Sequence, residues 1–246
     1  MTEQDTLPTD GSGSLERELG GQGFALVRRP AMLALLQPYG LSDWDGFAGS
    51  WGDLGMDLYM ADGGRYRRRR HANYAVTGGE IRRKPHQPHY QSRDYNMLNG
   101  GLERWFSPVT EEIGHHPALL SILRLCDATF TALTPPALRP DTWHVELHQF
   151  RIEARTDEAG QPTPEGLHRD GVDWVLVLLV SRLNIASGDT SIHDLQRQKL
   201  GSFTLTEPLD SAFVDDSRVY HGVTAVRPLD PGHPACRDVL VVTFRR

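Results

Sequence analysis

The chain has 246 residues, with 24 glycines, 16 prolines and a formal net charge of −6 at pH 7. This length suits one large domain, and the acidic balance argues against a general nucleic-acid binder. The longest apolar run, residues 174–180, is far too short to span a bilayer. Two cysteines and the lack of a basic-then-apolar leader pattern predict a cytoplasmic protein with no membrane partner and no disulfide framework.

The first part of the chain mixes short strands with helices. Residues 1–22 are polar and rich in glycine, serine and threonine, which predicts a flexible tail. "FALVRR" (24–29) predicts a strand, and Pro30 then opens a helix, because proline is favoured at the first helical position. "LSDWDGFAGSW" (41–51) has apolar residues at helical spacing behind a Ser42 cap.

A basic segment and a long helix complete this part. "MDLYM" (56–60) and "GRYRRRRHANYAV" (64–76) predict strands with polar, basic faces. "PALLSILRLCDATFTAL" (117–133) predicts the clearest helix of the chain, because its apolar residues share one face. Pro135 and Pro136 end it.

The second part of the chain is a series of strands. Each is rich in β-branched or apolar residues and is bounded by Gly, Pro, Asp or Ser. They are "WHVELHQFRI" (143–152), "DWVLVLLV" (173–180), "DTSIHDL" (189–195), "GSFTLT" (201–206), "SAFVDD" (211–216), "RVYHGVTAV" (218–226) and "RDVLVVTFRR" (237–246). With no strong helix between them, they predict an antiparallel sandwich or barrel. We expect one domain over 23–246, with mixed elements over 23–139 and the main strands over 140–246.

One motif points to metal chemistry. His168 and Asp170 form the only His-x-Asp of the chain, directly before an apolar strand, and alternation places both side chains on one side. His221, in a later strand, is the natural third ligand. Two imidazoles and one carboxylate form the facial triad of non-haem Fe(II) oxygenases, whereas a structural zinc site would need four ligands. A His-x-Asp pair also occurs often by chance, so the motif alone does not decide.

A second group competes for the same role. His144, Glu146 and His148 share one face of a predicted strand. The two histidines are about 13 Å apart along a strand, too far to bind one ion easily. We therefore interpret these three residues as polar lining or as paired structural groups.

An acidic cosubstrate would need a cation. Arg237 opens the last predicted strand, which should lie beside the strand of His221. A planar guanidinium suits a carboxylate in bidentate geometry. The alternative is an edge arginine paired with Asp238.

Several blocks resemble a known family. "HQFRIEAR" (148–155), "GQPTPEGLHRDGVDWVLVLLVSRLNI" (160–185), "FVDDSRVYHGVTAV" (213–226) and "RDVLVVTF" (237–244) are similar to bacterial 2-oxoglutarate/Fe(II) dioxygenases, the family that includes free L-isoleucine 4-hydroxylase. "QSRDYNMLNGGLERWF" (91–106) and "GRYRRRR" (64–70) are similar to its N-terminal part. The resemblance covers most of the chain from about residue 20.

This resemblance implies a mainly β fold with flanking helices and a double-stranded β-helix core, the jelly-roll or cupin-like fold. It implies His168, Asp170 and His221 as ligands of Fe(II), and Arg237 as the partner of the distal carboxylate of 2-oxoglutarate. With O2 as the other cosubstrate, the implied reaction oxidises an unactivated C–H bond of a free amino acid or similar small molecule. Hydroxylation is the usual outcome, and desaturation, ring closure or a carrier-tethered substrate stay open. "SGDT" (187–190) departs from an expected double glycine.

A free amino acid would need both a cation and an acceptor in its pocket. Arg67 and Arg69 share one strand face and are candidates, although a solvated edge is the favoured interpretation of either one. Gln149 and Arg151 are further candidates for cosubstrate or substrate contacts. Asp173 could meet an ammonium group or pair with a surface arginine.

Two hypotheses of other classes remain. One is a jelly-roll sensor that binds a small acid without turnover, and the retained triad and Arg237 disfavour it. The other is a nucleic-acid module built on the arginine run, disfavoured by the acidic charge and the lack of stacking aromatics. The sequence gives no indication of the oligomeric state.

Overall fold

The computed structural model describes residues 12–246, and its largest feature is one antiparallel sheet. The eight strands are β1 (Phe24–Val27), β2 (Gly55–Met56), β3 (Arg67–Thr77), β4 (Glu80–Arg83), β7 (Trp143–Ala154), β8 (Trp174–Leu183), β12 (Ser211–Asp215) and β15 (Ala235–Arg245). They are arranged in the order β1–β12–β8–β15–β7–β3–β2, with β4 paired to β3. All seven strands expected in the second part of the chain are present, here and in the smaller sheets.

Three smaller antiparallel sheets complete the β structure. They are β11 (Lys199–Thr204)–β10 (Asp189–His193)–β13 (Tyr220–Val223), β14 (Val226–Pro228)–β9 (Ile185–Ser187) and β5 (His89–Tyr90)–β6 (Glu103–Arg104). Ile192 and Phe203 from the three-stranded sheet pack in one core with Val175 and Val239 of the main sheet. The two layers therefore enclose an interior, as expected of the predicted jelly-roll core.

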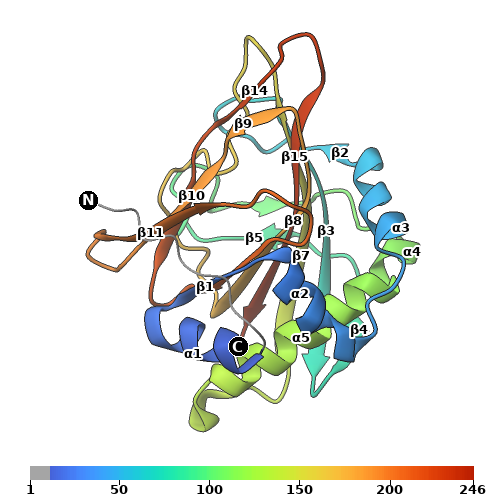
Figure 1. The fold of residues 1–246 in the computed structure, drawn as a ribbon, viewed down its shortest axis with the longest axis vertical. Helices are drawn as coiled ribbons and strands as arrows, with labels where there is room; N and C mark the ends of the chain where they lie inside the picture. The colour runs from blue at the N-terminus through green and yellow to red at the C-terminus, as the bar shows by residue number, and fades with distance from the viewer. Residues whose placement is uncertain (1–11) are drawn as a thin grey trace.

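The helices cover the other face of the main sheet (Figure 1). They are α1 (Ser12–Gln22), α2 (Arg29–Leu36), α3 (Trp44–Gly49), α4 (Glu111–Gly114) and α5 (Pro117–Leu133), with short 3-10 turns η1 (Gln37–Tyr39), η2 (Ser50–Asp53) and η3 (Pro136–Leu138). In Figure 1 they lie along the lower and right-hand sides of the molecule, away from β9, β10 and β14. None of the helices between residues 12 and 246 is long and apolar enough to cross a bilayer.

Strand alternation decides what faces the interior. On β8, Leu176 and Leu178 pack toward the helices, whereas Val175 joins the inner core. Both faces of β8 are buried, which explains its continuous apolar sequence. On β7, Leu147 packs toward the helices, so its alternate neighbours Glu146 and His148 point inward. The polar residues of β7 therefore line the space between the layers.

The prediction of a flexible tail over residues 1–22 is wrong for residues 12–22. Residues 12–22 form α1, and Leu15 and Leu19 are completely buried in the core shared with α5. The two leucines are four residues apart and share one helix face, which is the signal that the polar composition concealed. Residues 1–11 lie outside the described part of the chain.

Two smaller expectations also fail. The side chain of Asp43, not Ser42, caps α3 by accepting a hydrogen bond from Gly46 N at 3.2 Å. Only Met56 of "MDLYM" lies in a strand, because the short β2 ends there and Leu58 is 83% exposed.

Candidate functional site

His168 and His221 are brought together by backbone pairing. The two residues form an isolated antiparallel bridge between the loop before β8 and strand β13. Each backbone N–H donates to the carbonyl of the other at 3.0 Å. The imidazole ring centroids lie 4.5 Å apart, and both side chains are more than nine-tenths buried.

Asp170 completes the group. Its Oδ1 lies 3.7 Å from His168 Nε2 and its Oδ2 lies 3.6 Å from His221 Nε2. One ligand atom from each of the three residues lies within 4.8 Å of the others. The structure thus brings together the three residues that the sequence analysis selected.

The ring orientation of His168 suits a metal ligand. Its Nδ1–H donates to the carbonyl of Gly166 at 3.0 Å, which leaves Nε2 facing Asp170. Burial opposes protonation, but the carboxylates of Asp170 and Glu165 outweigh it and raise the pKa of His168 to about 9. Burial likewise opposes ionisation of Asp170, but the facing imidazoles hold its pKa below the ordinary value. The carboxylate is therefore anionic, and two imidazoles and one carboxylate are the donor set that suits Fe(II) with open positions.

Asp216 positions the loop that carries Asp170. Its carboxylate accepts hydrogen bonds from the backbone N–H of Asp170 (2.8 Å), Gly171 (2.8 Å) and Val172 (3.1 Å). Asp216 is only 1% exposed, and burial and the charge of Asp170 raise its pKa. The sequence analysis did not select Asp216, because a carboxylate that binds only backbone groups leaves no spacing signal.

Replacing Asp216 with alanine should weaken iron binding by about 10- to 100-fold, the usual effect of losing an outer partner of a ligand. Three backbone donors lose their acceptor, so we also expect a loss of about 1–3 kcal/mol in the free energy of unfolding. Iron titration and urea denaturation measure the two effects. The exposed Asp157→Ala variant is the control, and iron affinity equal to wild type in the Asp216 variant would contradict a positioning role.

Arg237 is a buried guanidinium without an anionic partner among residues 12–246. It is 2% exposed, and its Nε and Nη2 have no hydrogen-bond partner. Burial and the nearby charge of Arg182 lower its pKa to about 10. Asp238, the alternative partner, instead binds Arg151 through two contacts of 2.8 Å. The free donors of Arg237 fit the distal carboxylate of 2-oxoglutarate.

One cavity of about 260 Å³ contains the triad and Arg237. Its apolar walls come from the inner faces of β7, β8 and β15, including Phe150, Val177 and Val239. A concave, mostly apolar space with a few convergent polar groups is typical of a small-molecule site.

Arg67 and Arg69 also line this cavity. They are only 5% and 4% exposed, so the solvated-edge interpretation is wrong for both. Asp57 pairs with both: its Oδ2 lies 2.7 Å from Arg67 Nε and 3.5 Å from Arg69 Nη1. The rings of Phe106 and Phe150 cover this face of β3, with their centroids 3.5 and 4.4 Å from the guanidinium carbon of Arg69.

Three other candidates do not line the cavity. The amide of Gln149 donates to Ser50 Oγ at 2.8 Å, on the helix side of β7. Arg151 lies on that side too, bound to Asp238. Asp173 pairs with Arg246 at 2.7 Å, which is the surface pairing considered for it. Phe150 lines the cavity, and strand alternation places Gln149 and Arg151 on the opposite face of β7. Both were therefore wrong candidates.

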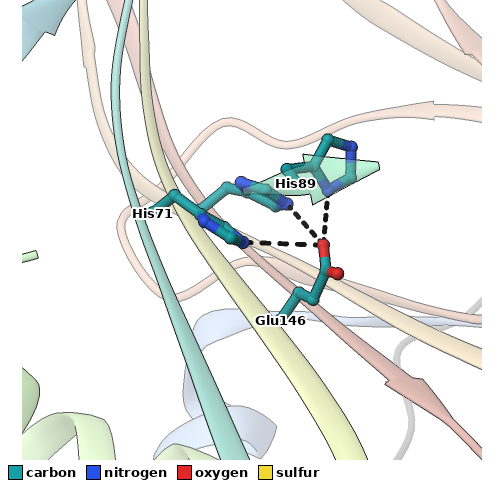
Figure 2. A group of neighbouring side chains, drawn as sticks. His71, His89 and Glu146 are labelled. Atoms are coloured by element: carbon teal, nitrogen blue, oxygen red, sulfur yellow. Dashed lines mark hydrogen bonds and ion pairs between the residues drawn. The ribbon is translucent and has the colours of Figure 1, made fainter. Parts of the chain in front are cut away.

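A second cluster of polar side chains lies deeper in the cavity wall. Figure 2 shows His71, His89 and Glu146 pointing toward one another from β3, β5 and β7. His148 belongs to the same group, and one ligand atom from each of the four lies within 4.8 Å of the others. His71 is fully buried, and burial lowers its pKa to about 4.

Arg69 and Lys84 determine which ring nitrogen of His148 and His144 carries the proton. Arg69 Nη2 donates to His148 Nδ1 at 2.7 Å, and Lys84 Nζ donates to His144 Nδ1 at 2.7 Å. Each ring then carries its proton on Nε2, on the side of Glu146. His148 therefore has no lone pair left for a metal ion. The contacts agree with the expectation of polar lining and paired groups for His144, Glu146 and His148.

The "SGDT" segment forms a left-handed turn beside Arg237. Ser187 has φ +62° and Gly188 has φ +80°, a conformation that favours glycine at both positions. A Cβ at Gly188 would lie 2.9 Å from Val226 Cγ1 and 3.8 Å from Arg237 Cδ. The serine keeps the turn that the expected double glycine would make.

Comparisons with known proteins point to one family. The model of the 2OG-Fe dioxygenase family matches residues 48–243. L-isoleucine-4-hydroxylase from Bacillus thuringiensis is 30% identical over 157 residues, which are 63% of this chain and 64% of that protein. The 3(1)-hydroxy-L-isoleucine 4-dioxygenase of Pantoea ananatis is 26% identical over 173 residues, 68% of either chain. The match therefore spans slightly under two thirds of the Bacillus protein.

A solved structure matches over the whole length. The crystal structure of a bsmA homolog from Methylobium petroleophilum PM1 is 36% identical, with a TM-score of 0.87. The match covers 100% of this chain and 96% of that one. The two chains thus share the fold over the described residues.

Proposed function

The chain belongs to the 2OG-Fe dioxygenase family, and on that premise we propose that it hydroxylates an unactivated C–H bond of a free amino acid or a similar small molecule. Family membership implies Fe(II) as cofactor and 2-oxoglutarate and O2 as cosubstrates. The observation that carries the proposal is the meeting of His168, Asp170 and His221 in the cavity that holds Arg237. A sensor without turnover would not need this complete set.

The residues have distinct parts in this reaction. Bound Fe(II), with 2-oxoglutarate and O2, supplies the oxidising chemistry, and 2-oxoglutarate is converted to succinate and CO2. The triad would hold the metal, and Arg237 would hold the distal carboxylate of the cosubstrate. The apolar wall of Phe150, Val177 and Val239 excludes water and holds the target carbon in place.

Two observations support an amino acid as substrate. The two curated relatives carry names of enzymes that act on isoleucine or hydroxyisoleucine. The cavity also offers cations, such as Arg67, and an anion, Glu146. Burial opposes ionisation of Glu146, but its imidazole donors hold its pKa far below the ordinary value. A zwitterion finds partners for both charges in such a space.

A screen by mass spectrometry tests the proposal. The protein is incubated with Fe(II), 2-oxoglutarate, O2 and each of the twenty amino acids, and succinate is measured in parallel. We expect a gain of one oxygen atom in at least one amino acid, together with succinate. Binding of 2-oxoglutarate without succinate from any mixture would favour the sensor hypothesis instead.

A further inference from the structure

Arg104 is a further buried arginine that lines the cavity. It lies on β6, whose partner β5 places His89 directly opposite it. Both residues line the cavity, while Glu103, the chain neighbour of Arg104, is exposed. The short β5–β6 ribbon thus presents a guanidinium to the site from the side opposite the main sheet.

Within residues 12–246, Arg104 has no hydrogen-bond or ion-pair partner. It is 2% exposed, and its Nε is buried without an acceptor. Burial and the charge of Arg67 lower its pKa, so its neighbourhood disfavours the cation. A buried charge without a partner is strongly destabilising, and such a group is expected to meet an anion that comes from outside the chain.

The other buried arginines of the cavity differ from Arg104, because each has an anionic partner or a proposed one. Arg67 and Arg69 both lie against Asp57, with contacts of 2.7 and 3.5 Å. Arg237 has no carboxylate partner either, but 2-oxoglutarate accounts for it. One carboxylate of the cosubstrate would lie at the metal and the other at Arg237, which leaves Arg104 for a different anion.

We propose that Arg104 binds the carboxylate of the substrate, and hence that the substrate is a free acid and not an amide, an ester or a carrier-bound thioester. The proposal rests on the proposed function and makes its substrate class specific. Guanidinium and carboxylate match in bidentate geometry. A carrier-bound thioester has no carboxylate at that position and would leave the buried guanidinium of Arg104 without a hydrogen-bonded anion.

The surroundings favour a singly charged group. Asp57, Glu146 and Glu165 are close enough to Arg104 to affect its pKa. These carboxylates would repel a phosphate dianion more than a carboxylate. His89, the cross-strand neighbour of Arg104, hydrogen-bonds Glu146. An anion therefore lies near the proposed carboxylate site, as the zwitterionic end of an amino acid requires.

The first test needs no ligand. Arg104→Met removes a buried charge that has no hydrogen-bond or ion-pair partner, and we expect the midpoint of thermal unfolding to rise by about 2–4 °C. Arg67→Met is the matched control, because it removes an equal group that does have a partner, and its midpoint should fall. A fall of equal size in Arg104→Met would show that Arg104 already has a structural partner and would overturn the proposal.

The second test measures binding in the iron-loaded protein with 2-oxoglutarate under argon, where turnover is prevented. The probes are the twenty L-amino acids and the primary amides of those that raise the unfolding midpoint of the wild type. We expect the amides to produce no shift, and the Arg104→Met variant to bind the acids about 10- to 100-fold more weakly, as calorimetry would show. Equal binding of acids and amides, or no binding by any amino acid, would contradict the proposal.

The outcomes separate this proposal from the proposed function. If no mixture yields succinate, the oxygenase function fails, whatever Arg104 binds. If succinate forms and amides are oxidised as well as acids, the oxygenase function stands and the carboxylate site at Arg104 fails. A shift of 2-oxoglutarate affinity in Arg104→Met, with amino-acid affinity unchanged, would assign Arg104 to the cosubstrate and also overturn the proposal.

Discussion

Replacing His168 with alanine is expected to abolish product formation and to lower iron affinity by more than about 100-fold. Losing even an outer partner of a ligand costs 10- to 100-fold, and this change removes one of three ligands. The imidazole Nε2 lies 3.7 Å from Asp170 Oδ1, and no other histidine in the described part of the chain shares the group with Asp170 and His221. Metal content by mass spectrometry and turnover of 2-oxoglutarate measure the effect.

The fold should survive this substitution. The bridge between residues 168 and 221 uses backbone atoms only, so alanine keeps both 3.0 Å hydrogen bonds. His233→Ala is the control, because its side chain is 70% exposed on a loop. Full iron occupancy and turnover in His168→Ala, with normal circular dichroism, would show that the ligand assignment is wrong.

Replacing Arg237 with methionine should raise the KM for 2-oxoglutarate by about 30-fold or more. Truncating one partner of a buried, hydrogen-bonded charge pair costs about 2–5 kcal/mol, and each 1.4 kcal/mol is a tenfold change. The effect should fall on the cosubstrate, because Nε and Nη2 have no partner among residues 12–246 and the side chain lies in the cavity.

Comparing this variant with Arg104→Met makes the assignment specific. Arg237→Met should weaken 2-oxoglutarate with little effect on amino-acid binding, and Arg104→Met should do the reverse. Steady-state kinetics with each compound varied in turn measure both constants. An unchanged KM for 2-oxoglutarate in Arg237→Met would contradict the role given to this arginine.

The strands of the second part of the chain were predictable because each is short, apolar and bounded by turn residues. The triad was predictable too, since His168 and Asp170 are two residues apart in sequence and His221 follows in a recognisable strand. The tail was misjudged at 12–22, where two leucines four residues apart carried the signal for α1. The order of residues along one strand or helix was therefore enough to predict that element and the side chains on it.

Strand alternation alone could have excluded two residues that were wrongly assigned to the site. His144, Glu146 and His148 were placed on one face of their strand, and the same period puts Gln149 and Arg151 on the other. The burial of Arg67 and Arg69 could not be predicted in this way, because the ring of Phe106, from a separate segment, covers their face of β3.

Arg104 was not predictable from the sequence. It lies in a two-residue strand whose partner is fourteen residues earlier, and no periodicity marks either one. The same holds for His71 and His89, which meet Glu146 from separate strands. Contacts of this kind depend on the closure of the two layers, which no local pattern encodes.

The ion pair of Arg151 and Asp238 has a consequence for how β15 assembles. Asp238 faces the helices, bound also by Ser181 Oγ at 2.8 Å, while its neighbour Arg237 faces the cavity. A slip of β15 by one residue would exchange these two faces, burying the carboxylate inside and expelling the guanidinium. The outer pair therefore penalises that misalignment during folding, so two residues that do not line the cavity help to keep Arg237 directed into it.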